Sequence, residues 1–125
     1  MSGAREPLVT RVVQLVRERL RDRWRRRPRR VLVRGSSMLP TLRDGDVVVA
    51  LPGAAVRPGE LALVRWPARP GQLSVKRAAL AFDDGWFALG DAPAASTDSR
   101  TLGPAEALGP VRWRLWPHPA RLRAR

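Results

Sequence analysis

One side chain stands apart in this sequence of 125 residues: of its 24 Lys and Arg residues, Lys76 is the only lysine. An arginine in a protein keeps its proton, whereas a lysine amine becomes neutral when burial lowers its pKa far enough. Lys76 interrupts an apolar stretch beside Val75 and Ala78, so its amine is either buried there or reaches out to water. If it is buried, lowering its pKa by two units raises the neutral fraction about a hundredfold.

A glycine-led turn supplies candidate nucleophiles for such an amine. The segment Gly35-Ser36-Ser37 follows a predicted strand and exposes hydroxyls and backbone N–H groups together. A neutral amine within reach of a serine hydroxyl can take its proton, which is the Ser/Lys form of nucleophilic catalysis. Further along, Asp98 and Arg100 flank one residue, so on an extended segment both side chains would point to one side and could pair.

Short apolar runs separated by turn signals predict the framework that positions these side chains. Candidate strands lie at residues 31–34, 46–51, 61–66, 73–80, 86–89 and 111–116. The Asp-Gly and Pro-Gly pairs between them are typical of tight turns. Since no long helix separates the strands, the pattern predicts a mainly β domain of antiparallel sheets over residues 31–117.

The two ends of the chain are predicted to differ from this domain. Over residues 8–24 apolar side chains recur every three or four positions with arginines largely off that stripe, so residues 1–30 are predicted to form a basic amphipathic helix and a connector. This helix could pack on the domain, lie on an anionic membrane or contact nucleic acid. Residues 118–125 are predicted to be a flexible basic tail.

The composition excludes several classes of protein. Cysteine is absent and His118 is the only histidine, which excludes thiolate zinc sites, iron–sulfur clusters and histidine-rich metal centres, and no cofactor is predicted. No apolar run approaches the length of a membrane span, and the first ten residues lack the apolar core of a secretory leader. The chain is therefore predicted to be cytoplasmic, with peripheral membrane contact through residues 8–24 as an alternative.

Three segments, taken together, resemble the motifs of the type I signal peptidase family. They are GSSMLPTL at residues 35–42, VKR at 75–77 and GDAPAASTDSR at 90–100, and they occur in the family's order across about half of the chain. The sequence AASTDSRT at 94–101 most resembles one branch, the nickel-type superoxide dismutase maturation proteases. The resemblance implies antiparallel β-sheets and a serine peptidase.

Carried over residue by residue, the resemblance implies a role for each motif position. Ser37 would be the nucleophile and Lys76 the general base. Ser96 would hold the lysine amine by a hydrogen bond, and Asp98 with Arg100 would support the site as an ion pair.

The resemblance also implies how the oxyanion and the substrate would be bound. The backbone N–H of Ser37 would be one oxyanion donor. Many members carry a serine where this chain has Gly35, so a backbone N–H such as that of Gly35 would have to replace a side-chain donor. The third motif departs too, with Ala92 in place of the usual asparagine. Met38 and Leu39 are expected near the wall of a substrate subsite.

The function implied is a serine endopeptidase that removes an N-terminal leader from a protein precursor, with the precursor of a nickel superoxide dismutase as its substrate. The metal would belong to that substrate. A general signal peptidase acting at a membrane is an alternative. A self-cleaving repressor is a further one, although no Ala-Gly dipeptide occurs in the sequence. The net charge of +13 and five tryptophans leave a non-enzymatic alternative, an Arg-rich nucleic-acid-binding module.

Overall fold

The computed structural model describes residues 11, 27–94 and 97–125. The amphipathic helix predicted over residues 8–24 lies outside this part of the chain except for Arg11, and Ser96 also lies outside it.

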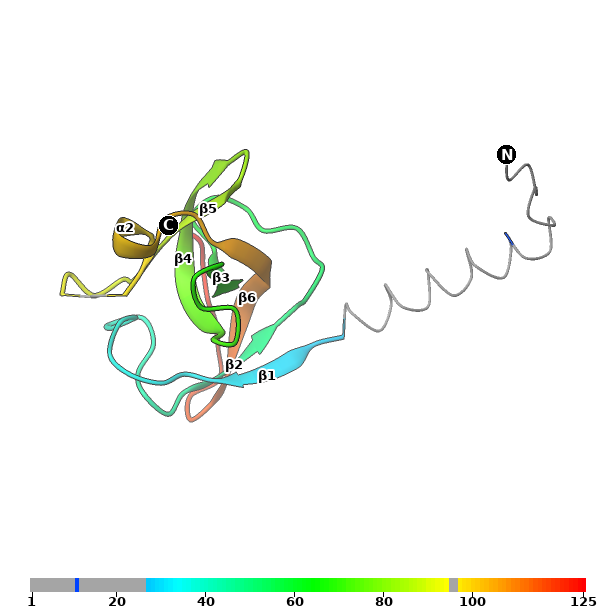
Figure 1. The fold of residues 1–125 in the computed structure, drawn as a ribbon. Helices are drawn as coiled ribbons and strands as arrows, with labels where there is room; N and C mark the ends of the chain where they lie inside the picture. Colours follow the sequence, from blue (N-terminus) through cyan, green and yellow to red (C-terminus); the bar gives the residue numbers. More distant parts are fainter. Residues whose placement is uncertain (1–10, 12–26, 95–96) are drawn as a thin grey trace, which may run out of the picture.

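Residues 27–94 and 97–125 contain seven strands and one short helix, joined by turns and loops (Figure 1). Their bounds are β1 Arg29–Leu32, β2 Val47–Ala50, β3 Leu61–Arg65, β4 Ser74–Phe82, β5 Gly85–Leu89, α2 Ser99–Leu102, β6 Glu106–Trp116 and β7 Ala120–Arg121. Each of the six predicted strands overlaps one of these, and the predicted mainly β fold is confirmed. No helix in the described ranges is long and apolar enough to cross a membrane.

The strands form one antiparallel sheet in the order β1-β2-β6-β3-β4-β5, and the seventh strand, β7, pairs with β6 outside this order. Strand β6 is the longest and joins the two halves of this sheet. Its first part pairs with β3 and its second part with β2, so Val111 lies opposite both Leu61 and Ala50. The sheet therefore continues from one half to the other through this single strand, which Figure 1 labels near the centre of the domain.

Strand β3 lies at the centre and is buried on both faces, as expected for a strand made of an unbroken apolar run. Leu61 and Leu63 point into one core cluster, and Ala62 and Val64 point into a second cluster on the opposite face. The neighbouring strand β4 pairs with β3 and is also buried over residues 75–78. A polar side chain in that part of β4 is thus removed from bulk water whichever face it occupies.

The end of the chain differs from its prediction. The sequence predicts a flexible tail over residues 118–125, whereas the structure pairs Ala120–Arg121 with β6 as β7. The Arg125 N–H also donates to the carbonyl oxygen of Gly59 at 3.0 Å. The pairing of β3 with β6 ends at Val111, and the last residues of the chain pair with β6 beyond that point, at Trp113 and Arg114.

Close backbone packing at Gly109 gives a prediction about stability. A Cβ at this position would collide with the carbonyl of Leu51 and come within 2.9 Å of the Cα of Pro52. We expect Gly109→Ala to lower the free energy of unfolding by about 1–3 kcal/mol, the usual range for overpacking, as measured by urea denaturation. The control is Gly71→Ala, where a Cβ would meet nothing within 4 Å. Equal effects of the two substitutions would contradict this account.

Candidate active site

The loop that carries Ser37 is pinned at both ends. Between β1 and β2, the Val33 N–H donates to the Asp46 carbonyl and the Val33 carbonyl accepts from the Gly45 N–H, each at 2.8 Å. At the turn itself Gly35 has a φ of +80°, a conformation that favours glycine. Just beyond Ser37, the buried side chain of Met38 anchors the loop in the core. The serine is therefore held between fixed points.

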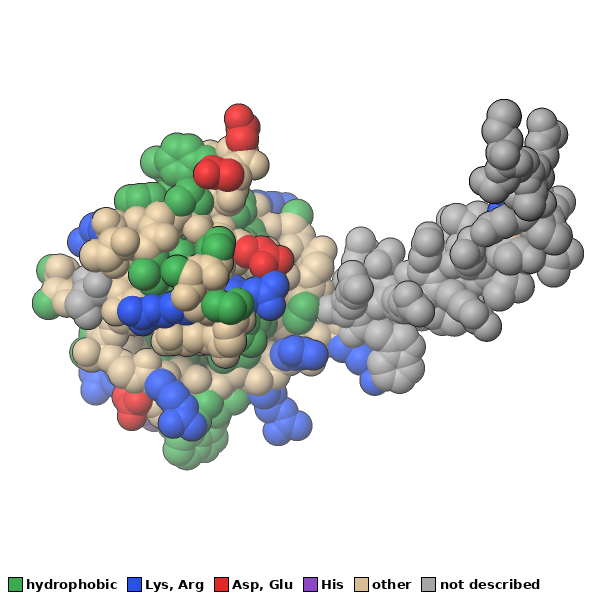
Figure 2. Space-filling view, viewed as in Figure 1, with side chains coloured by type: hydrophobic (Ala, Val, Ile, Leu, Met, Phe, Trp, Pro, Cys, Tyr) green, Lys and Arg blue, Asp and Glu red, His purple; other side chains and the backbone are tan. Residues whose placement is uncertain are grey.

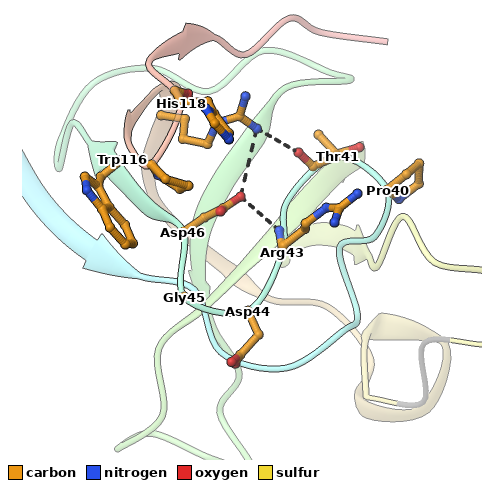
Figure 3. A pocket seen from close by; sticks show the side chains of 10 residues that line it. Pro40, Thr41, Arg43, Asp44, Gly45, Asp46, Trp116 and His118 are labelled. Atoms are coloured by element: carbon orange, nitrogen blue, oxygen red, sulfur yellow. Dashed lines mark hydrogen bonds and ion pairs between the residues drawn. The ribbon is translucent and has the colours of Figure 1, made fainter.

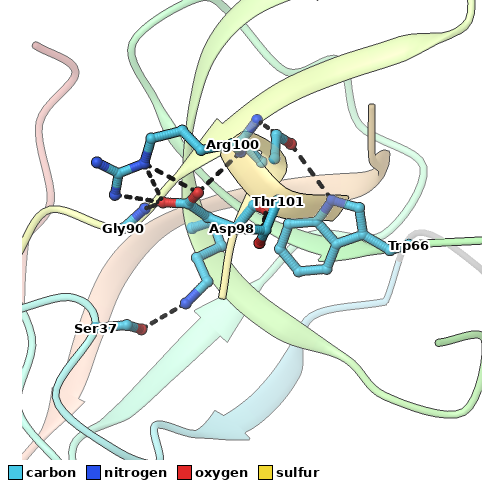
Figure 4. Close-up of polar contacts among 9 residues, drawn as sticks. Ser37, Trp66, Gly90, Asp98, Arg100 and Thr101 are labelled. Carbon is cyan, nitrogen blue, oxygen red and sulfur yellow. Dashed lines mark hydrogen bonds and ion pairs between the residues drawn. The ribbon is translucent and has the colours of Figure 1, made fainter. Parts of the chain in front are cut away.

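Lys76 meets this serine from β4. The residue is only 5% exposed, and its Nζ donates a hydrogen bond to Ser37 Oγ at 2.5 Å (Figure 4). The two residues are 39 positions apart in the sequence, so only the fold brings them together. The structure thus places side by side the hydroxyl that the resemblance had marked as the nucleophile and the amine that the sequence had singled out as the lone lysine.

The surroundings of Lys76 favour the neutral amine. Burial lowers the pKa of Lys76 below its ordinary value, because an ammonium ion loses hydration there. The negative charge of Asp98 acts in the opposite sense and raises the pKa, but burial is the larger influence. An amine with a lowered pKa holds its proton less firmly and can accept one from an alcohol at a lower pH than an exposed lysine.

Asp98 and Arg100 form the expected ion pair, with Arg100 Nη2 2.7 Å from Asp98 Oδ2. The local structure differs from the extended segment that the alternation of these residues suggested. Asp98 is instead the N-cap of α2 and accepts the Arg100 N–H at 3.0 Å and the Gly90 N–H at 3.1 Å (Figure 4). A carboxylate can cap a helix in this way because it accepts the free N–H groups of the first turn.

The same carboxylate is held in its charged form. Burial alone would raise the pKa of Asp98, but its hydrogen bonds from Arg100 and Gly90 and the charge of Arg100 bring it below the ordinary value. The turn that carries it is fixed from the other side by Trp66, whose Nε1 donates to the Gly103 carbonyl at 3.0 Å. A fixed negative charge therefore lies in electrostatic range of the lysine amine.

A second ion pair, in which both side chains are buried, was not predicted from the sequence. Arg77 donates to Asp91 through Nε at 3.1 Å and Nη2 at 2.6 Å, and the Thr41 hydroxyl donates to the same carboxylate at 2.5 Å. The next residue, Ala92, donates its N–H to the Ser37 carbonyl at 3.0 Å. Since Arg77 and Asp91 both lie within the motifs, their opposite charges were the signal that could have suggested the pair.

The proposed oxyanion donors are not equally available. The Ser37 N–H has no acceptor among the described residues. The Gly35 N–H donates to Asp44 Oδ1 at 2.7 Å, so the structure does not leave it free to bind an oxyanion. The expectation for Gly35 must be corrected on this point, because the Asp44 carboxylate was not foreseen as its acceptor.

A groove of about 510 Å³ opens beside Ser37 and Lys76. One wall comes from residues 31–38 and the other from residues 72–76, with Ala92, Ala94 and Thr97 completing the lining. Met38 belongs to the lining, as expected, whereas Leu39 does not. A groove with a wall of chain on either side suits an extended peptide.

A separate cavity of about 540 Å³ is lined by residues within 40–46, the part of the loop that follows Ser37, and within 114–118 (Figure 3). His118 and Trp116 line this cavity and are absent from the lining of the groove, so the histidine is not placed to serve as a base for Ser37. Arg114 Nη1 donates to the Thr41 carbonyl and lies 3.9 Å from Asp46 Oδ2. These two contacts join β6 to the loop between β1 and β2. No group of three or more His, Asp or Glu side chains within the described ranges could hold a metal ion.

Comparison with known proteins agrees with a peptidase. The model of a family described as Peptidase S24-like matches residues 20–89, more than half of the chain. The matched range includes both Ser37 and Lys76. No curated protein matches the sequence. The family differs in name from the signal peptidases identified by resemblance, but it agrees with them in being a family of serine peptidases.

The buried Arg77–Asp91 pair gives a prediction about pH. Burial would raise the pKa of Asp91, but its hydrogen bonds from Arg77 and Thr41 and the charge of Arg77 hold it below the ordinary value. The stabilisation from the charged form is therefore complete above about pH 5 and is lost as the pH falls below about 4 toward the folded-state pKa. We expect Asp91→Asn to lower the free energy of unfolding by about 3 kcal/mol at pH 7, with the deficit shrinking at acid pH.

Urea denaturation between pH 7 and pH 3 measures this dependence. Asp83→Asn, at an exposed position in the turn between β4 and β5, is the matched control and should show little deficit at any pH. A deficit for Asp91→Asn that stays constant down to pH 3 would show that the carboxylate charge does not stabilise the fold.

Proposed function

The chain belongs to the Peptidase S24-like family, and we propose that it is a serine endopeptidase in which Ser37 is the nucleophile and Lys76 the general base. The observation that carries this proposal is the hydrogen bond between Lys76 Nζ and Ser37 Oγ at 2.5 Å, beside a groove of about 510 Å³. A nucleophile and a base within hydrogen-bond reach are the minimum that serine peptidase chemistry requires.

The first half of the reaction uses the neutral amine. Lys76 Nζ takes the proton from Ser37 Oγ as that oxygen attacks the carbonyl carbon of the scissile peptide bond. The resulting oxyanion accepts the Ser37 N–H. When the tetrahedral intermediate collapses, the lysine ammonium gives its proton to the leaving nitrogen, and an ester to Ser37 remains.

The second half repeats these steps with water. Lys76 takes a proton from a water molecule as the water oxygen attacks the ester carbonyl. Collapse breaks the bond to Ser37 Oγ, which recovers the proton from the lysine. The free carboxylate leaves, and both side chains return to their starting states.

Asp98 and Arg100 act on this cycle from a distance. In each half the lysine becomes positively charged for a time, and the buried carboxylate of Asp98 stabilises that charge. Arg100 keeps the carboxylate ionised and fixed in place. We propose, from the resemblance alone, that Ser96 orients the amine by a hydrogen bond.

For the substrate, we propose the N-terminal leader of a nickel superoxide dismutase precursor. The support is the resemblance of residues 94–101 to that maturation branch. Removal of the leader would free an amino terminus that the substrate uses to bind nickel. The chain's own role would end at hydrolysis.

Two substitutions test the proposed pair. We expect Ser37→Ala and Lys76→Arg each to lower kcat/KM by a factor of at least about 10⁴, because one removes the nucleophile and the other replaces the base with a group that keeps its proton. Ser36→Ala is the matched control and should retain activity. In the unsubstituted chain, kcat/KM should rise with pH to a plateau whose midpoint lies below the roughly 10.4 of a free lysine. Activity retained in Lys76→Arg would refute the neutral-amine mechanism.

A precursor peptide tests the proposed substrate separately. We expect a peptide that spans the leader junction of a nickel superoxide dismutase precursor to be cleaved at that junction, with mass spectrometry locating the bond. A peptide with the same residues in scrambled order is the control. Cleavage of other peptides but never of the junction would reject this substrate and leave the peptidase proposal standing.

A further inference from the structure

The groove beside Ser37 carries very little charge of its own. Among the described side chains that line it, only Arg34 and Lys76 are ionisable, and none of them is acidic. Lys76 is buried and bonded to Ser37, so Arg34 supplies the exposed charge of the groove. Arg34 forms no ion pair with any residue in the described part of the chain. No side chain in the described ranges therefore competes with the substrate for this guanidinium.

The backbone holds Arg34 firmly in this position. The residue before it, Val33, is bonded through both its N–H and its carbonyl, and the residue after it, Gly35, is bonded to Asp44. The Val33 side chain is buried in the core, whereas Arg34 is exposed and belongs to the lining of the groove. The nearby Asp44 carboxylate accepts the Gly35 N–H and does not pair with Arg34.

The position of Arg34 relative to Ser37 sets how far its ligand lies from the scissile bond. Arg34 precedes Ser37 by three residues, so their Cα atoms lie no more than about 11 Å apart, and the turn at Gly35 brings them closer than that limit. A peptide lying in the groove with its carbonyl at Ser37 therefore passes Arg34 within about three residues of that carbonyl. A guanidinium at such a place best binds a carboxylate, which can accept two of its N–H groups at once.

We propose that Arg34 is a specificity-determining residue that selects peptides with an aspartate or glutamate within about three residues of the scissile bond. This inference rests on the proposed peptidase function and adds the charge of the substrate to it. The wider surface acts in the same sense: Lys and Arg side chains are spread over the face shown in Figure 2, and the chain has a net charge of +13. An acidic peptide is attracted by this field and then oriented by Arg34.

A library of many peptide sequences tests the preference directly. The full-length chain and its Arg34→Gln and Arg34→Glu variants are incubated with peptides from a digested proteome, and mass spectrometry locates the cleaved bonds. We expect the unsubstituted chain to cut sites enriched in Asp and Glu near the bond, Arg34→Gln to lose that enrichment, and Arg34→Glu to favour Lys and Arg instead. Arg29→Gln, an exposed β1 residue outside the groove lining, makes the same change of charge and should keep the enrichment.

Matched peptides then give the size of the effect. For one cleaved sequence made with Glu or Gln at the selected position, we expect kcat/KM to favour Glu about fivefold, as for an ion pair at a partly exposed site. This ratio should fall toward one in about 0.5 M salt and in Arg34→Gln. Cleavage without any acidic enrichment, or with the same enrichment in Arg34→Gln, would overturn the inference while leaving the peptidase proposal intact. Failure of the unsubstituted chain to cut any peptide would instead reject the proposed function, and this inference with it.

Discussion

The chemistry proposed for this protein depends on one amine that the fold removes from water. Lys76 lies in a strand that is buried where it pairs with β3, and its Nζ contacts Ser37 Oγ. Burial of an ammonium ion is unfavourable, and the lowered pKa of Lys76 expresses that penalty. The neighbouring Asp98 offsets part of it, so the amine can lose its proton to begin a reaction and regain one during it. Stronger burial would favour only the neutral amine, and a closer carboxylate would favour only the ammonium ion.

The surrounding network explains how the amine and the hydroxyl stay aligned. Three parts of the chain that are distant in the sequence meet at the site: the loop with Ser37, strand β4, and a third segment, which comprises residues 90–94 with Asp98. The Arg77–Asp91 pair joins β4 to the third segment, and the Ala92 N–H joins that segment to the serine loop. Buried charges destabilise a fold unless they are paired, and both buried carboxylates of this network have an arginine partner. The polar groups that frame the site are therefore satisfied by one another.

Local pattern was enough to predict much of this arrangement. The apolar runs of β2 to β5 and the turn pairs between them are strong signals, because a strand buried on one or both faces must be apolar there. The lone lysine in β4 stood out because it interrupts one of these apolar runs. The N-cap role of Asp98 was missed, since a single helical turn has no periodicity to detect. The Arg77–Asp91 pair and the position of β7 depend on contacts between distant segments, which spacing along the chain does not reveal.

The titration of Lys76 is the sharpest test of whether the fold favours its neutral amine. Because the chain has one lysine, labelling lysine with ¹³C at Cε gives a single side-chain signal whose chemical shift can be followed with pH by NMR. We expect a midpoint clearly below about 10.4 in the folded protein and a return toward that value in concentrated urea. A midpoint at or above about 10.4 in the folded protein would contradict it, because the amine would then be held as an ammonium ion and could not accept the serine proton.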